Sequence, residues 1–508
     1  MKKLIFLTTN YEASLWPLCM LGEALYFDFE KTYGVRFADA LLGQWEGRTN
    51  QFAAPADAHD SVARAILSRI DADPSWAEFV CQKILAESKA LHSESRRVTF
   101  GDLSRPSNRE LARRYDAYTK AFKRMYVPAW LPNATEGRSG LLTQRLEEYV
   151  RERAGNSAGA KEIVSFAITP NRLSGREREE RAFLTLMCRV FRSRKQRQIF
   201  SADSTTAPLA LEKLPTLKSA FRGHIKKYGW MSFNYDGPPF SVSDLVDRAC
   251  LLYQSGESPT RRIKRLEKER IIRNARKATV IKKIGLYKDK KVAYTFRLAE
   301  RLMYLKDYRK DVLFHSYFMM DRLIREIGRR YELSATQVKH ILPGEMRHFL
   351  EGRLKLTSNI LNERIRCSVL FFSCGTMCLE VGRRAHALVK KYAETPPVDT
   401  CARQLNGECA YPGKARGIVR IICSTSDMSK MRQGDILVSV STNPNLLPAI
   451  RKAAGIITDR GGITCHAAII ARELGIPCII GTGVATRVLT DGECVSLDAS
   501  IGRVERSL

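Results

Sequence analysis

The chain has 508 residues, of which 44% are hydrophobic, enough to bury two or three separate cores. No apolar run approaches the roughly 18 to 20 residues that a membrane-spanning helix needs, which excludes a helical membrane protein. Thirteen cysteines, an odd number scattered among apolar neighbours, fit reduced thiols and exclude a disulfide-rich secreted domain.

The formal charge of +30 is spread unevenly along the chain. Residues 403–508 hold 13 basic and 9 acidic side chains, whereas residues 261–310 alone hold 19 basic and 5 acidic ones. Such a basic block is typical of surfaces that bind nucleic acid, an acidic substrate or an acidic protein, and also of a solvated helix. The composition leaves these alternatives open.

The first 394 residues are predicted to be mainly α-helical. Apolar residues recur at three- and four-residue steps over 15–26, 61–89, 107–126, 141–152 and 178–193. Ser107 suits the N-cap of the third helix, and a connector over 169–177 precedes the fifth. The apolar opening Leu4–Leu7 breaks at Thr8 without a clear cleavage site, so we expect a cytoplasmic protein with no signal peptide.

Residues 221–240 interrupt this helical pattern with aromatic, basic and turn residues. We expect a loop that faces a substrate, since loops on rigid scaffolds often carry binding chemistry, although an exposed linker has a similar composition. The candidate substrate contacts in this stretch are His224, Lys227, Tyr228 and Trp230. No phosphate-binding glycine loop of the P-loop or dinucleotide type occurs in this half of the sequence.

A basic helix is predicted over 261–275, and one long helix or a broken pair over 297–331. Arg297, Arg301 and His315 are candidate contacts of a phosphorylated or acidic substrate, because guanidinium groups bind phosphate with two hydrogen bonds at once. The alternative is that these cations pair with acidic residues of the same helix at helical spacings.

Residues 367–381 are predicted to form a β-hairpin around Cys374–Thr376, and 383–393 a closing helix. Cys374 and Cys378 have no second pair of cysteines and no ligand histidine near them in sequence, so no metal ligand is predicted.

A Pro-containing linker over 395–402 is predicted to separate two domains. After it come short apolar strands divided by glycine turns, which predicts a small β/β/α module over 403–508. The strands are expected at 415–423, 435–441, 455–458, 478–481 and 494–497. The expected fold class is therefore multi-domain, with a helical region followed by this compact module.

The most informative stretch lies inside this module. Gly455–Thr458 suits a buried strand, and Gly461–Gly462 a turn that lets the backbone approach a ligand closely. Thr464 stands where an N-cap belongs, good helix formers follow, and Gly475 ends the helix. His466 thus falls in the first turn, where a nucleophilic imidazole meets free N–H groups and the positive end of the helix dipole.

The stretch from Thr458 to Pro477 resembles, nearly position for position, the phosphohistidine signature of the phosphoenolpyruvate-utilising enzymes. This family includes phosphoenolpyruvate synthase, pyruvate phosphate dikinase, rifampin phosphotransferase and enzyme I of the sugar phosphotransferase system. The resemblance implies that His466 carries phosphate, that Thr464 orients its ring, and that Gly461 and Gly462 give the phosphate room. Arg472 is a candidate contact behind the histidine, or a salt-bridged residue.

In this family an ATP-grasp domain charges the histidine or a barrel domain binds phosphoenolpyruvate, and the swivelling domain carries the phosphoryl group between sites. Neither domain is recognised in this sequence. The resemblance therefore implies a phosphotransferase component whose His466 is charged by a separate ATP-grasp partner. It would deliver phosphate to a small-molecule acceptor in the helical domain, with His224 and His315 as candidate general bases. ATP and Mg²⁺ are implied on the partner, with no cofactor tightly bound here.

Two other functions stay open at this stage. A basic nucleic-acid-binding or regulatory protein with a vestigial phosphohistidine module would account for the basic block, and its binding would depend steeply on salt. A self-sufficient ATP-dependent phosphotransferase would need a nucleotide site without a standard glycine-loop motif. The sequence does not identify the phosphate acceptor.

Overall fold

A computed structural model describes residues 3–154, 160–201, 211–212, 214–283, 285, 288–394, 398–442, 446–460 and 465–506. The chain divides into two compact units. The first comprises Met1–Leu4, Ala13–Gly47 and Ala53–Tyr392, and the second comprises Ile5–Glu12, Arg48–Phe52 and Ala393–Leu508. The prediction of one continuous region over 1–394 missed the two short N-terminal segments that group with the C-terminal module. None of the described helices has the length and apolar character needed to cross a lipid bilayer.

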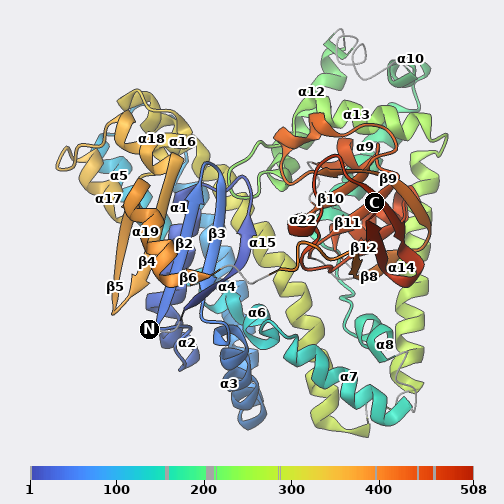
Figure 1. Ribbon diagram of the computed structural model, residues 1–508. Coiled ribbons are helices and arrows are strands. Elements are labelled where there is room, and N and C mark those ends of the chain that lie inside the picture. Colours follow the sequence, from blue (N-terminus) through green and yellow to red (C-terminus); the bar gives the residue numbers. More distant parts are fainter. Residues whose placement is uncertain are drawn as a thin grey trace. The chain divides into compact units, whose positions relative to one another are not determined.

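The first unit is mainly helical (Figure 1). Its helices are α1 (Leu15–Glu23), η1 (Ala24–Asp28), α2 (Phe29–Tyr33), α3 (Ala58–Ala72), α4 (Pro74–Val98), α5 (Asn108–Tyr126), η2 (Pro128–Trp130), α6 (Leu131–Glu136), α7 (Leu141–Ala154), α8 (Ala160–Ala167), α9 (Gly175–Val190), α10 (Arg194–Gln198), η3 (Ile199–Ser201), α12 (Pro215–Tyr228), η4 (Gly229–Ser232), α13 (Val242–Gln254), α14 (Pro259–Lys283), α15 (Lys290–Tyr331), α16 (Ala335–Val338), α17 (Pro343–Leu350), α18 (Ser358–Arg366) and α19 (Gly382–Tyr392).

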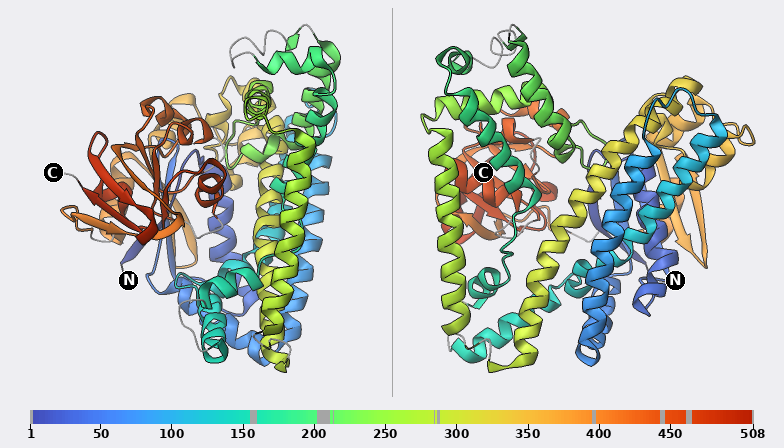
Figure 2. Two further views of the ribbon diagram at one scale, coloured as in Figure 1. Left: turned by 90° about the vertical axis from the view of Figure 1, so that its right-hand side faces the viewer. Right: turned by 180° about the vertical axis from the view of Figure 1, so that it is seen from behind.

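The helical character predicted for this region is confirmed, except that the stretch 61–89 forms two helices, α3 and α4, which separate at Asp73, the N-cap of α4. The caps explain where the helices begin. The Ser107 hydroxyl accepts a hydrogen bond from the Glu110 N–H at 3.2 Å, which satisfies a free donor in the first turn of α5. Helix α15 is a single helix of 42 residues, so the broken-pair alternative is wrong. It runs beside α4 in both views of Figure 2 and joins α5 through a hydrogen bond of 3.0 Å between Tyr118 and Ser316.

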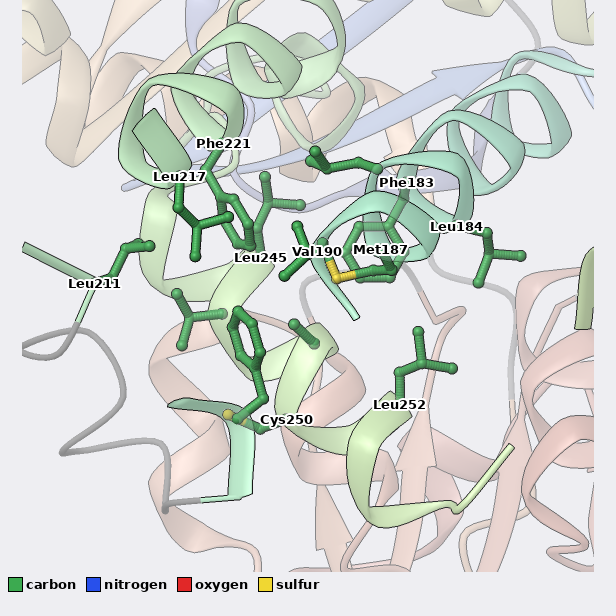
Figure 3. Packing of buried hydrophobic residues seen from close by; sticks show 14 residues of the cluster. Phe183, Leu184, Met187, Val190, Leu211, Leu217, Phe221, Leu245, Cys250 and Leu252 are labelled. Atoms are coloured by element: carbon green, nitrogen blue, oxygen red, sulfur yellow. The ribbon is translucent and has the colours of Figure 1, made fainter. Parts of the chain in front are cut away.

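The loop predicted at 221–240 is wrong in its first half. Residues 215–228 form α12, and Phe221 is fully buried among apolar side chains of α9 and α13 (Figure 3). Burial of Phe221 and Leu217 on one helical face favours the helix. The free energy gained by removing their apolar area from water exceeds the small free-energy cost of a glycine in the middle of the helix. The loop itself begins after η4.

A set of three antiparallel strands, part of a six-stranded sheet, completes the described core of the first unit. It consists of β2 (Ala40–Glu46), β4 (Cys367–Ser373) and β5 (Thr376–Val381), in the order β2-β4-β5. The predicted hairpin is confirmed: Cys374 and Gly375 have φ of 50° and 73°, as a two-residue hairpin turn requires. Strand β2 was missed because six of its seven residues are buried, so the sequence shows no alternation of apolar and polar residues.

The C-terminal module of the second unit is built on one eight-stranded sheet with the order β7-β14-β13-β9-β10-β11-β12-β8. Strands β9 to β12 are parallel, and the flanking pairs are antiparallel. The bounds are β7 (Gln404–Asn406), β8 (Glu408–Tyr411), β9 (Lys414–Ile421), β10 (Ile436–Ser439), β11 (Gly455–Thr458), β12 (Cys478–Ile480), β13 (Cys494–Asp498) and β14 (Arg503–Arg506). The five predicted strands are confirmed, and β7, β8 and β14 were missed. Strands β1 (Leu4–Asn10), β3 (Thr49–Ala54) and β6 (Ala393–Glu394) lie largely in the segments of this unit outside the module's sheet.

Alternate residues of the parallel strands pack into two separate hydrophobic cores, one on each face of the sheet. Leu437 and Ile456 pack with α20 (Leu447–Ile450) and α21 (His466–Leu474), whereas Ile436 and Ile457 pack with α22 (Ala485–Val488) and β13. Because the side chains of a strand point to opposite faces in turn, both faces of the sheet are covered and the strands read as continuous apolar runs. This burial fixes the register of the strands and thereby the positions of the loops that follow them.

Candidate functional site

Helix α21 places His466 at the carboxyl ends of the parallel strands. The helix follows β11, begins at His466 and ends before Gly475, whose φ of 68° is the left-handed conformation that glycine adopts readily. Ala467, Ala468 and Ala471 are buried against the sheet, which fixes the helix in place. The first backbone N–H groups of a helix have no partner within it and point toward its amino end, so this position is suited to an anion.

The cap of α21 differs from the prediction. Cys465 occupies the N-cap position with φ −72° and ψ 166°, and its side chain makes no capping hydrogen bond. Thr464, Gly461 and Gly462, which the resemblance assigned to the ring and to the phosphate, lie outside the described residues. Their predicted roles stay predictions.

A buried carboxylate, Asp459, joins the ends of two strands next to this helix. Asp459 follows β11 and is 8% exposed. Its Oδ1 accepts hydrogen bonds from the Thr482 hydroxyl and the Thr486 N–H, both at 3.1 Å, and its Oδ2 accepts a short one from the Thr486 hydroxyl. One side chain therefore fixes the loop after β12 and the start of α22 to the end of β11.

Backbone hydrogen bonds extend this network across the strand ends. The N–H of Asp459 donates to the Ser439 carbonyl at 3.0 Å, and the N–H of Thr482 donates to the Thr458 carbonyl at 3.1 Å. The N–H of Gly483 donates to the Asp459 carbonyl at 2.9 Å. Sequence reasoning did not identify Asp459 or Thr486; the available signal was a set of polar residues directly after buried strands, where the ligand sites of parallel sheets are found.

An N-terminal segment adds a tyrosine to the same unit. Tyr11 belongs to the segment Ile5–Glu12. Burial, together with the neighbouring Cys423 thiol and the Asp459 carboxylate, raises the pKa of Tyr11 well above its ordinary value. The phenol therefore keeps its proton. In addition, the Arg460 guanidinium donates to the Leu7 carbonyl at 2.6 Å, so the segment contacts the residue that follows Asp459.

Arg472 lies on α21 at an exposed position. Its Nε donates to the Ala410 carbonyl at 3.2 Å, which ties the helix to β8. This contact gives Arg472 a role in holding α21 on the sheet, whatever it contributes to chemistry.

The seven predicted substrate contacts all lie in the first unit, and the structure does not gather them into one site. His224 is buried, with its Nε2 2.8 Å from Glu179, which also accepts a hydrogen bond of 2.7 Å from Arg248. Such a buried, charge-paired network stabilises the packing of α9, α12 and α13. Lys227 is exposed and lies over the Tyr228 ring at 5.1 Å, close to His224 on the same helix.

Two of the seven predicted residues, Trp230 and His315, do come together. Their ring centroids are 5.3 Å apart, and the His315 ring stacks on His92 of α4 at 4.8 Å, with 3.1 Å between the two Nδ1 atoms. All three rings are only partly buried. This aromatic group, formed by His92, Trp230 and His315, is the part of the predicted substrate surface that the fold assembles.

The remaining two, Arg297 and Arg301, lie elsewhere on α15. Arg301 forms a short ion pair with Glu78 of α4, and Arg297 is exposed. The predicted pairing at helical spacings is wrong for Arg301, because its partner comes from another helix. A surface hollow of about 540 Å³ between α3 and α7 is lined by none of the predicted residues.

The His92–His315 contact predicts a measurable pH dependence. Burial, with His92 and Arg96 nearby, lowers the pKa of His315 to about 4, below the ordinary value of 6.5. Between these pH values the unfolded chain binds a proton that the folded chain does not, so stability falls as the pH drops from 6.5 toward 4. Over the two pH units from 6.5 to 4.5, at about 1.4 kcal/mol per unit, we expect a loss of about 2 to 3 kcal/mol.

Urea unfolding of the wild type and of His315→Gln at pH 7 and pH 4.5 measures this loss of stability. The wild type should lose more stability than the variant over this interval, since the variant has no proton to gain at this position. An equal loss in both proteins would contradict the burial argument.

Comparisons with known proteins match the C-terminal module. The family model described as "PEP-utilising enzyme, mobile domain" matches residues 431–502. A probable phosphoenolpyruvate synthase of Methanothermobacter thermautotrophicus is 53% identical over 100 residues, covering 20% of this chain and 15% of that protein. The phosphoenolpyruvate synthase of Pyrococcus furiosus is 44% identical over 115 residues, covering 23% of this chain and 14% of that protein. The match therefore spans about a seventh of each relative.

A solved structure, the holo-form of Thermococcus kodakaraensis aconitase X, aligns with 21% of this chain and 100% of that chain at 22% identity. Its TM-score of 0.17 is too low to carry an argument about fold or function.

Proposed function

We propose that the protein is a phosphotransferase component with His466 as its phosphoryl carrier, because residues 431–502 of its C-terminal module match the mobile domain of the phosphoenolpyruvate-utilising enzymes. The observation that carries this proposal is the position of His466, the first residue of α21, within residues 431–502, which match the family model of the mobile domain. The helix start provides backbone donors for the phosphoryl oxygens, and the burial of Ala467, Ala468 and Ala471 against the sheet fixes the helix in place.

The proposed chemistry has two displacement steps. A ring nitrogen of neutral His466 attacks phosphorus, a P–N bond forms, and the bond from phosphorus to the donor's leaving oxygen breaks. An acceptor oxygen or nitrogen then attacks the same phosphorus, the P–N bond breaks, and histidine is regenerated as the acceptor loses its proton to a base. The chain's residues position and stabilise the phosphoryl group, while the donor brings the free energy.

We extend the proposal to the donor and the acceptor. A separate ATP-grasp protein, holding ATP and Mg²⁺, charges His466. The support is that the match covers only about a fifth of this chain, and no standard nucleotide-binding loop occurs in the first half of the sequence. A small-molecule acceptor binds the helical unit, for which the aromatic group His92, Trp230 and His315 is the best assembled surface, since aromatic rings and imidazoles combine stacking with proton transfer.

Labelling the purified full chain tests the proposal. The chain is incubated with ATP labelled at the γ-phosphate, with and without a candidate ATP-grasp partner, and separately with labelled phosphoenolpyruvate. We expect label that is lost in acid, survives alkali and maps to the peptide containing His466. Acid-stable label, or label on another peptide, would contradict a phosphohistidine carrier. Label from ATP without the partner would instead support a self-sufficient enzyme.

Binding to unrelated DNA and RNA at two salt concentrations tests the nucleic-acid alternative. The observation that favours it is α14, on which eleven basic and two acidic side chains fall within 25 residues. If this helix binds nucleic acid, affinity should fall steeply with salt, because bound cations displace counterions from the phosphates.

A further inference from the structure

Three side chains with metal-binding atoms meet at one end of the β2-β4-β5 sheet. Among the residues that the structure describes, Glu46, Cys367 and His386 form the group whose ligand atoms all lie within 4.8 Å of one another. They come from three elements: the last residue of β2, the first of β4 and the middle of α19. The sequence predicted no metal ligand because these residues are far apart along the chain.

The backbone places two of the three ligands directly opposite each other. Glu46 and Cys367 are register partners in the antiparallel pair β2-β4, so their side chains leave the sheet on the same face. Cys367 is buried, while Glu46 and His386 are exposed. A metal ion held here would have the thiol on its buried side, and its opposite side would stay open to water.

The separation of the thiol and the imidazole fits zinc. The Cys367 Sγ lies 3.6 Å from the His386 Nε2. Tetrahedral zinc, with a Zn–S distance near 2.3 Å and Zn–N near 2.0 to 2.1 Å, holds two such atoms about 3.6 Å apart. The Glu46 carboxylate, whose ligand atom lies within 4.8 Å of the other two, reaches tetrahedral spacing by a movement of up to about 1 Å. Its exposed side chain has rotatable bonds that allow this movement.

We propose that Glu46, Cys367 and His386 bind one zinc ion, with water as the fourth ligand. The thiol gives up its proton to solvent when it binds the metal. Gln44 donates a hydrogen bond of 2.8 Å to Glu46, which orients the carboxylate from behind. Zinc at this position fastens α19, the last helix of the first unit, to the sheet, and it stabilises the segment from which the chain passes into the C-terminal module.

Cobalt and zinc binding to the full chain test the proposal. Titration with Co²⁺ alone should give one equivalent of a thiolate-to-cobalt charge-transfer band, which Zn²⁺ alone displaces. Cys367→Ser should remove the band, and His386→Gln and Glu46→Gln should each weaken zinc binding, with a loss of at least about 100-fold for His386→Gln, because a direct ligand is lost. Zinc should also raise the Tm of the wild type but not that of His386→Gln.

Cys378→Ser and His348→Ala serve as matched controls. Cys378 is an exposed cysteine in the same hairpin, and His348 is an exposed histidine on α17. Neither should change the band or the zinc affinity. The proposal is overturned if the wild type shows no charge-transfer band, or if the band persists in Cys367→Ser. Because His386 is exposed, His386→Gln should fold. Its zinc affinity therefore tests the proposal even if Cys367→Ser does not fold.

Discussion

Replacing His466 by alanine is expected to lower the rate of acid-labile phosphorylation of the chain by at least about a thousandfold, since the nucleophile is removed and no second step can replace it. The fold should be unaffected. Alanine favours the helix more than histidine does, and the packing of α21 depends on Ala467, Ala468 and Ala471, which stay in place. The measurement is the initial rate of label incorporation, with the melting temperature recorded alongside.

His348→Ala is the control for this substitution. His348 is exposed on α17 in the first unit, so removing it tests whether any accessible histidine accepts label. It should label at the wild-type rate. Undiminished label in His466→Ala, at unchanged melting temperature, would show that the phosphoryl group goes to another residue and would remove the basis of the proposed function.

Replacing Asp459 by alanine is expected to destabilise the second unit by about 2 to 4 kcal/mol. The buried carboxylate accepts three hydrogen bonds from Thr482 and Thr486. Each hydrogen bond to a charged group is worth about 1.5 to 3 kcal/mol, and the Thr486 N–H and hydroxyl lose this acceptor, although water partly replaces it. The Thr482 hydroxyl keeps a second acceptor, the Thr458 carbonyl, at 3.2 Å. The loop after β12 and the start of α22 should open first.

Native-state hydrogen exchange of the amides in residues 478–488 measures this effect where it should occur, and the labelling rate shows whether looser strand ends slow phosphorylation. Glu505→Ala is the control, since Glu505 lies on β14 with a side chain that is 56% exposed. Such a surface substitution should change the free energy of unfolding by no more than about 0.5 kcal/mol. Equal exchange in the two variants would contradict the role assigned to Asp459.

The C-terminal module was predictable because its signals are local. The apolar runs of β10, β11 and β12 are buried on both faces and bounded by glycines, and the left-handed Gly475 ends α21 where expected. The error at its N-cap is one residue in size. Thr464 was predicted at this position, and the adjacent Cys465 occupies it.

The helical unit was predictable in its elements but not in its substrate surface. His224 has the composition of a binding residue, but in the fold it pairs with Glu179, which lies 45 residues earlier in the sequence. The contact between Trp230 and His315 depends on η4 packing against α15. Contacts between residues this far apart in the sequence depend on how the helices pack. Helical periodicity gives no information about that packing.

The same reason explains the missed residues of the second unit and of the proposed zinc site. Tyr11 lies more than 400 residues before Asp459 in the sequence, and Glu46 lies more than 300 before Cys367. No spacing rule covers such distances. They are set by strand register, which is fixed by the buried faces of the sheets.

The discontinuous second unit has a consequence for synthesis on the ribosome. Its segments Ile5–Glu12 and Arg48–Phe52 are made about 340 to 390 residues before Ala393, where the rest of the unit begins. At roughly 5 to 20 residues per second, this separation corresponds to about 20 to 80 s. Strands β1 and β3 are neighbours in their sheet, so the two segments can pair with each other during this time. We expect a fragment beginning at residue 393 to lack Leu7 and Tyr11, and therefore to be less stable than the second unit of the full chain.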